Sequence, residues 1–144
     1  MKTMTAPFTA RIAATAAVLT TALTLASPAA AAPIKAWSAM SGVEPAVLLH
    51  TAQELPLSAV AVDDQPYCAP DAEIATTLRH DFAEQRVDTT GVDGHRTELW
   101  GSDLMGTWTL VAARADDTSC IIASGIGFDA DTDSAAFYRT AGLI

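Results

Sequence analysis

Two cysteines, Cys68 and Cys120, constrain what this chain can fold into more than any other feature. In an oxidising compartment, a pair of cysteines in a small domain usually forms a disulfide. Closing a loop of about 52 residues would remove chain entropy worth roughly 4 kcal/mol from the unfolded state. Neither cysteine lies in a C-x-x-C motif or near a histidine, which disfavours a metal or redox role. We therefore expect a Cys68–Cys120 disulfide if the chain is exported.

Residues 1–32 have the pattern of a secretory signal peptide. Lys2 and Arg11 give a basic start, residues 12–26 are uncharged and largely apolar, and residues 27–32 supply an Ala-x-Ala cleavage site. The alternative of a membrane anchor is disfavoured because the apolar part is too short and too rich in Ala and Thr to span a bilayer. We predict a periplasmic or secreted protein with no stable membrane anchor after cleavage.

The charge of the chain excludes some partners. The sequence has 8 Lys and Arg against 17 Asp and Glu and a net charge of −9. Loss of the two basic residues of the signal peptide would take this to about −11. Because such a surface repels phosphates, we predict no nucleic-acid partner and no binding to anionic lipid. No pattern in the sequence indicates a cofactor.

Residues 68–128 have the pattern of an α+β domain. Ile74, Leu78 and Phe82 fall at i, i+4 and i+8, which predicts a helix with one buried stripe. Asp93-Gly94 is a strong signal for a two-residue hairpin turn. Four strands are expected, over 85–90, 96–100, 107–114 and 119–124. We predict one helix packed on a four-stranded antiparallel meander, with the disulfide joining the start of the helix to the last strand.

The alternation of side chains along a strand predicts the face on which Cys120 lies. Trp108 and Leu110 share one face of their strand. A three-residue turn with Asp117 in the left-handed conformation would set Cys120 beside them. We expect the helix to cover this face.

The flanking segments are harder to place. Residues 33–67 are expected to form a helical extension or linker, with a short helix over 44–54 and a short strand over 57–62. Residues 129–144 show no clear period, and we expect an acidic flexible tail there.

Three motifs carry a resemblance to a known group of proteins. Cys68-Ala69-Pro70, Gly106-Thr107-Trp108-Thr109 and the segment Cys120 to Gly125 resemble the C-A-P-R, G-T-W-T and T-C-L-V-A-S-G motifs of small exported proteins of Gram-negative bacteria. The resemblance covers roughly residues 68–127 and implies export but no particular activity. This chain departs from the group by its segment 33–67 and by Asp117, where glycine is common.

An enzymatic alternative rests on residues 41–54, which resemble the opening helix of lytic transglycosylases. In those enzymes a glutamate at the end of the helix is the general acid, a role that would fall to Glu54. The expected Glu-Ser-Gly falls instead on Leu55-Pro56-Leu57, and a general acid of this kind needs a walled cleft. A small cell-envelope hydrolase is therefore the alternative function, and no catalytic residue is predicted.

A weak calcium candidate lies near the end of the chain. Asp129, Asp131 and Asp133 match the first, third and fifth positions of a calcium loop. Ser134 stands where the loop needs glycine, and Thr140 where it needs a bidentate acid. No metal site is predicted.

Trp37 and Trp100 are candidates for a binding surface, because an exposed aromatic side chain can mark one. Packing against residues 33–67 would instead hide such a side chain, and we favour that interpretation. The leading prediction is a non-enzymatic exported module that binds an envelope protein or component through the open sheet face or through residues 33–67.

Overall fold

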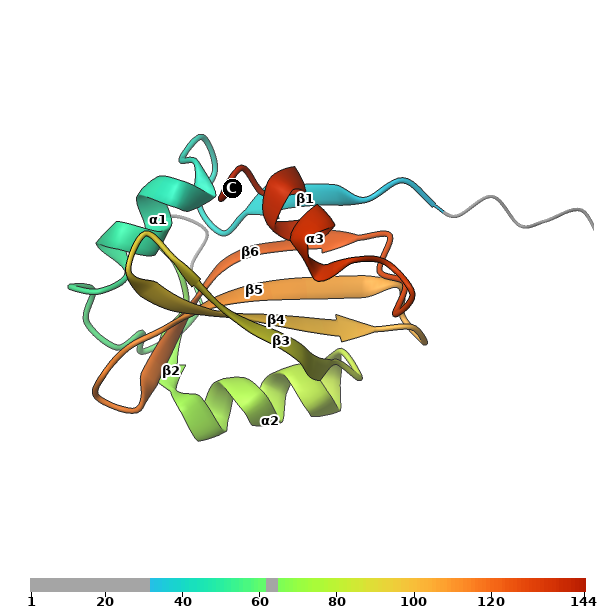
Figure 1. Cartoon of the computed structure of the whole chain (residues 1–144). Helices are drawn as coiled ribbons and strands as arrows, with labels where there is room; N and C mark the ends of the chain where they lie inside the picture. The colour runs from blue at the N-terminus through green and yellow to red at the C-terminus, as the bar shows by residue number, and fades with distance from the viewer. Residues whose placement is uncertain (1–31, 62–64) are drawn as a thin grey trace, which may run out of the picture.

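An antiparallel sheet forms the body of the protein (Figure 1). The computed structural model describes residues 32–61 and 65–144, and these form six strands and three helices. The strands are β1 (Lys35–Ser38), β2 (Cys68–Pro70), β3 (Gln85–Val92), β4 (His95–Ser102), β5 (Thr107–Ala113) and β6 (Thr118–Ile126). The helices are α1 (Pro45–Thr51), α2 (Asp71–Asp81) and α3 (Ser134–Thr140). The strand order is β1-β6-β5-β4-β3, and β2 also pairs with β6.

The expectation of one helix on a four-stranded meander is wrong. Two further strands, β1 and β2, pair antiparallel with successive parts of β6, so the sheet has six strands in the part of the chain described. Both are very short, four and three residues, and neither is long enough to show the alternation that identifies a strand. The segment Cys68-Ala69-Pro70, expected to open a helix, is the strand that precedes it.

The turns of the sheet follow the expected local chemistry. Asp93 and Gly94 connect β3 to β4 with φ of 48° and 80°, the pair of positive values that a two-residue hairpin turn requires. Asp117 has φ of 57° in the turn between β5 and β6, as the sequence predicted.

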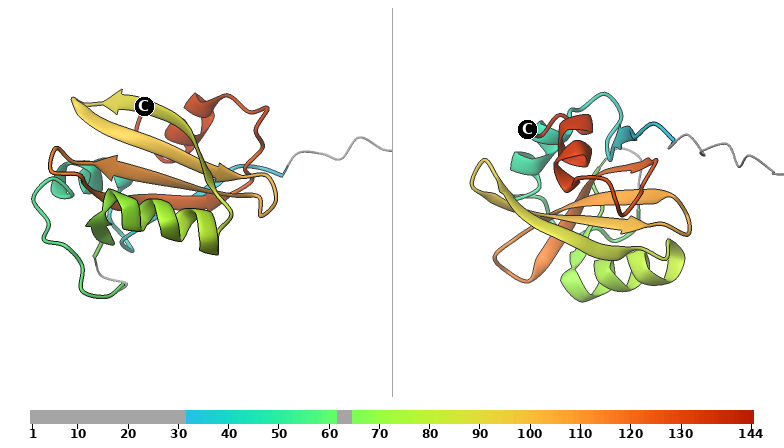
Figure 2. Two further views of the ribbon diagram at one scale, coloured as in Figure 1. Left: turned by 90° about the horizontal axis from the view of Figure 1, so that it is seen from below. Right: turned by 45° about the vertical axis from the view of Figure 1, so that its right-hand side comes forward.

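The two faces of the sheet carry separate clusters of buried side chains. Trp108, Leu110 and Cys120 share one face, as expected, but α1 and α3 cover it rather than α2. Figures 1 and 2 show these two helices on one side of the sheet and α2 on the other. On the α2 side, Ile74 and Leu78 pack in a smaller cluster. The expectation that α2 covers the Trp108 face is therefore wrong.

The C-terminal segment 129–144 contains α3, so the expectation of a flexible tail is corrected. Phe137 and Tyr138 of this helix are fully buried, and the Phe137 ring contacts Trp108 edge to face. The Asp133 side chain accepts a hydrogen bond from the Ala135 N–H and caps the helix. A helix of seven residues is too short to show a clear hydrophobic period in the sequence.

The segment before Cys68 is also part of the fold. It supplies β1 and α1, and α1 buries Leu48 and Leu49 in the main core. Residues 57–61 form no strand. The predicted signal peptide lies outside the described residues except for Ala32. No helix in the described segments is both long enough and apolar enough to cross a membrane.

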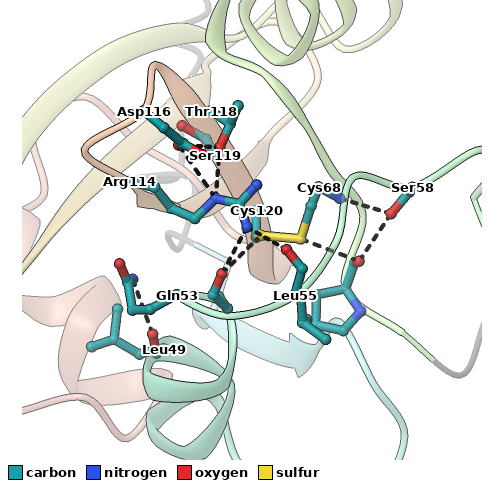
Figure 3. The surroundings of a disulfide bond; sticks show 12 residues. Leu49, Gln53, Leu55, Ser58, Cys68, Arg114, Asp116, Thr118, Ser119 and Cys120 are labelled. Atoms are coloured by element: carbon teal, nitrogen blue, oxygen red, sulfur yellow. Dashed lines mark hydrogen bonds and ion pairs between the residues drawn. A yellow bond between two sulfur atoms is a disulfide. The ribbon is translucent and has the colours of Figure 1, made fainter.

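The disulfide joins β2 to β6. Cys68 and Cys120 are direct partners in the strand register, with an S–S distance of 2.04 Å and a Cα–Cα distance of 4.0 Å, and both are fully buried (Figure 3). Beside the bridge, Arg114 donates from Nη1 to the Leu55 carbonyl at 2.5 Å and from Nε to Thr118 Oγ1 at 2.6 Å. The bridge and this arginine together hold the segment after α1 against the start of β6.

Candidate functional site

A groove of about 320 Å³ opens on the α2 side of the sheet. We call it the Glu84 groove, and most of its lining is apolar. Its lining includes Trp37 of β1, Leu78 of α2, Phe82 and Glu84 after α2, Thr107 and Thr109 of β5, and Ile126 of β6.

The backbone after α2 places Glu84 in this groove. The helix ends at Asp81, and Ala83 turns the chain with φ of 53°, a left-handed conformation that is unfavourable for alanine. The Glu84 N–H then donates to the Leu78 carbonyl at 2.9 Å, which fixes the residue against the last turns of the helix. Strand β3 begins at the next residue, so Glu84 is held between α2 and the sheet.

The Glu84 side chain is buried, and hydrogen bonds only partly offset the cost of burying its carboxyl group. The residue is only 1% exposed, and burial raises the pKa of its carboxyl group, while the nearby hydroxyls of Thr109 and Thr107 act in the opposite direction. Within the described residues, neither Glu84 Oε2 nor Thr107 Oγ1 has a hydrogen bond of normal distance and angle, although both threonine hydroxyls lie close enough to the carboxyl group to lower its pKa. Buried polar groups are normally paired, and an unpaired one costs about 1–3 kcal/mol. The lining of the groove therefore includes two buried polar atoms, Glu84 Oε2 and Thr107 Oγ1, whose hydrogen-bonding capacity is not fully used.

Large apolar side chains at the rim of the groove are open to solvent. Trp37 is 51% exposed, Phe82 44% and Ile126 43%. They come from three elements that are distant in the sequence. Exposed apolar side chains that gather around a cavity mark a binding surface more strongly than scattered ones.

Gly125 permits strand β1 to carry Trp37 to this position. It faces Ala36 in the pairing of β1 with β6. A Cβ atom at Gly125 would lie 1.9 Å from the Lys35 carbonyl oxygen and 2.5 Å from the Trp108 ring. Only glycine therefore allows β1 to pair closely with β6 here.

A second groove, of about 360 Å³, lies on the same side of the sheet and includes Trp100. Its charges are largely paired: Arg86 Nη1 lies 3.0 Å from Glu98 Oε1, and Trp100 Nε1 donates to Glu98 Oε2 at 3.1 Å. The guanidinium groups of Arg79 and Arg86 lie 5.3 Å and 5.9 Å from the centre of the Trp100 ring. Trp100 is thus only 2% exposed and offers no surface to a partner. Of the two tryptophans considered from the sequence, Trp37 is the one at an open site.

The calcium candidates have local structural roles. Asp129 Oδ1 accepts from the Asp131 N–H at 2.9 Å, and Asp133 caps α3 and lies 3.8 Å from Arg139. Across residues 32–61 and 65–144, no group of three or more His, Cys, Asp or Glu side chains could hold a metal ion.

Glu54, the residue of the enzymatic alternative, is exposed just after α1 and lines neither groove.

The sequence did not single out Glu84. A glutamate between a helix and a strand is ordinary, and its burial depends on how α2 lies on the sheet. A partial signal is present in β5, where Thr107 and Thr109 share a face with Val111 and so place hydroxyls on a side that a helix covers. Comparison of the chain with protein-family models, with curated proteins and with solved structures found no match.

Proposed function

We propose that this protein is an exported, non-enzymatic binding module whose Glu84 groove takes an apolar group of a cell-envelope component. The observation that carries the proposal is a buried, incompletely paired carboxyl group in a groove rimmed by exposed apolar side chains. The volume of about 320 Å³ lies within the range of small-molecule sites. The groove combines the sheet face with Trp37 from the segment before Cys68.

Export is supported by two independent features. The first 32 residues have the composition of a secretory signal peptide. The Cys68–Cys120 disulfide is fully buried, and disulfides persist mainly outside the reducing cytoplasm.

A hydrolase remains the second candidate because burial raises the pKa of Glu84, a property of general acids. Hydrolysis of a glycosidic bond commonly needs a second carboxylate on the other side of the bond. No other Asp or Glu is among the described residues that line the groove. The geometry therefore favours binding over catalysis.

Titration calorimetry with 1-octanol tests the binding proposal. Ile126→Asp places a charge at the groove rim, and Val47→Asp places one at a similarly exposed position on α1. We expect the oxidised protein to bind octanol, Ile126→Asp to weaken it at least tenfold, and Val47→Asp to change it less than twofold. Thermal unfolding first establishes that both variants fold. Absence of binding, or an equal effect of both substitutions, would overturn the proposal.

Peptidoglycan turnover separates the two candidate functions. We expect no turnover above the blank from the purified, oxidised protein. Turnover that disappears in either Glu54→Gln or Glu84→Gln would establish the hydrolase instead.

A further inference from the structure

The two unpaired polar atoms of the Glu84 groove come from different elements but can serve one ligand group. Glu84 Oε2 belongs to the loop after α2, and Thr107 Oγ1 to the first residue of β5. An ionised carboxylate only accepts hydrogen bonds, whereas the Thr107 hydroxyl can direct its proton toward Glu84, whose pKa it lowers, and still accept through its oxygen. Both atoms would therefore be satisfied by a group with several donors and no acceptor.

The described residues that line the groove carry no positive charge. Glu84 is the one titratable side chain among the described residues of the lining, which come from β1, α2 and the loop after it, β5 and β6. The charged or titratable side chains nearest to it along the chain are Arg79, His80 and Asp81 in the last turn of α2 and Arg86 in β3. None of these lines the groove, and Arg86 is paired with Glu98.

Strand β1 also carries a cation, Lys35. Lys35 lies on the same face of β1 as Trp37, but it does not line the groove and forms no ion pair within the described residues. A carboxylate buried without a countercharge favours the approach of a cation. The net charge of −9 for the whole chain acts in the same direction at long range.

We propose that the ligand of the groove is a primary alkylammonium, whose ammonium group donates to Glu84 and Thr107 while its alkyl chain lies among Trp37, Phe82 and Ile126. An ammonium ion has three donors and no acceptor, which matches the two acceptors at the site. The inference rests on the proposed binding function and adds the chemical class of the ligand.

The binding of an ammonium ion has a distinctive proton signature. Burial raises the pKa of Glu84, which extends to higher pH the range in which the free protein carries a proton on this carboxyl group. The cation binds the ionised form, so a proton is released on binding and the affinity rises with pH through the pKa of the free protein. Octanol, which has no charge, gives no such release.

Calorimetry with n-octylammonium, 1-octanol and octanoate tests the inference on the oxidised protein. At pH 7.5 we expect octylammonium to bind at least tenfold more tightly than octanol, and octanoate more weakly than either. Glu84→Gln should reduce the ratio of the octylammonium affinity to the octanol affinity to near one, and Thr107→Val should reduce this ratio severalfold. Glu54→Gln, an exposed glutamate outside the groove, should leave the preference unchanged. Buffers of different ionisation enthalpy report the proton release.

The outcomes distinguish this inference from the function on which it rests. Octanol bound as tightly as octylammonium, or octanoate bound more tightly, would overturn the ammonium assignment and leave the apolar groove standing. Absence of binding by all three compounds would overturn both. If Glu84→Gln fails to fold, the affinity ratio in Thr107→Val still decides the question, together with the rise in octylammonium affinity of the unsubstituted protein between pH 4 and pH 7.5.

Discussion

At the scale of single residues, Glu84 links the groove to the pH dependence of stability. Burial raises its pKa above the ordinary value of 4.5, so the folded protein binds more protons at this site than the unfolded chain. The contribution of Glu84 to stability is fully present below the unfolded pKa and is lost as the pH rises through the folded pKa.

Replacing Glu84 with Gln should remove this loss of stability at high pH. We expect Glu84→Gln to be more stable than the unsubstituted protein at pH 7.5, with a smaller advantage at pH 4, where the carboxyl group is protonated. Urea unfolding at the two pH values measures the difference. An equal effect of the substitution at both values would show that Glu84 does not titrate in this range.

Ala83 is the residue whose backbone conformation places Glu84 in the groove. Its φ of 53° has an energetic cost for a residue with a Cβ atom. Glycine adopts this conformation without that cost. We expect Ala83→Gly to raise the free energy of unfolding by about 0.5–1 kcal/mol, after the entropy cost of glycine in the unfolded chain. Ala115→Gly is the matched control, because Ala115 is exposed and does not have a positive φ. A loss of stability in Ala83→Gly would contradict this explanation.

Sequence patterns can predict the role of a residue when that role depends on the residue's own chemistry or on its neighbours in the chain. The hairpin turn at Asp93-Gly94 and the left-handed Asp117 follow from local conformational preferences. The Cys68–Cys120 bridge follows from there being two cysteines. The burial of Glu84 depends on contacts between α2, β5 and β6, which no local pattern contains.

At the scale of secondary-structure elements, α3 completes the main core. Phe137 is fully buried against Trp108 and Phe128. We expect Phe137→Ala to cost about 3–5 kcal/mol in urea unfolding. Ile144→Ala, at an exposed position in the same segment, should change stability by less than about 0.5 kcal/mol. A cost below about 1 kcal/mol for Phe137→Ala would restore the flexible tail that the sequence suggested.

The disulfide fixes the short strand β2 to β6. Its loop has a sequence separation of 52, and loss of the bridge in Cys68→Ala/Cys120→Ala should cost about 4 kcal/mol. Because the bridge is fully buried, the unsubstituted protein is reduced with dithiothreitol in urea and refolded in its presence; its Tm should then fall toward that of the variant, whose own Tm should not change. A Tm that dithiothreitol does not alter would show that the bridge is absent or makes no contribution.

The helices show where sequence patterns fail at this scale. The stripe of Ile74, Leu78 and Phe82 located α2 correctly but did not indicate which face of the sheet it covers. The Trp108 face is covered instead by α1 and α3, which are seven residues each. Phe82, expected to be buried, is at the rim of the groove because α2 ends before it.

At the scale of the whole molecule, the two faces of the sheet have different roles. The face under α1 and α3 holds the larger cluster of buried side chains and the disulfide. The opposite face carries α2 (Figure 2). The two grooves lie beside this helix. Stability and binding therefore depend on largely different sets of side chains, with Trp108 belonging to both, so that the other groove residues can be changed without removing the main core.

The indole N–H signals of the tryptophans provide the most direct measurement of where a ligand binds. Trp37 lines the Glu84 groove, whereas Trp100 lies in the second groove with its Nε1 bonded to Glu98. In ¹H–¹⁵N spectra whose three indole signals are assigned with Trp37→Phe and Trp100→Phe, titration with octylammonium should shift the Trp37 indole signal saturably and leave that of Trp100 in place. A shift of Trp100 without Trp37, or no saturable shift of either signal, would contradict binding in the Glu84 groove.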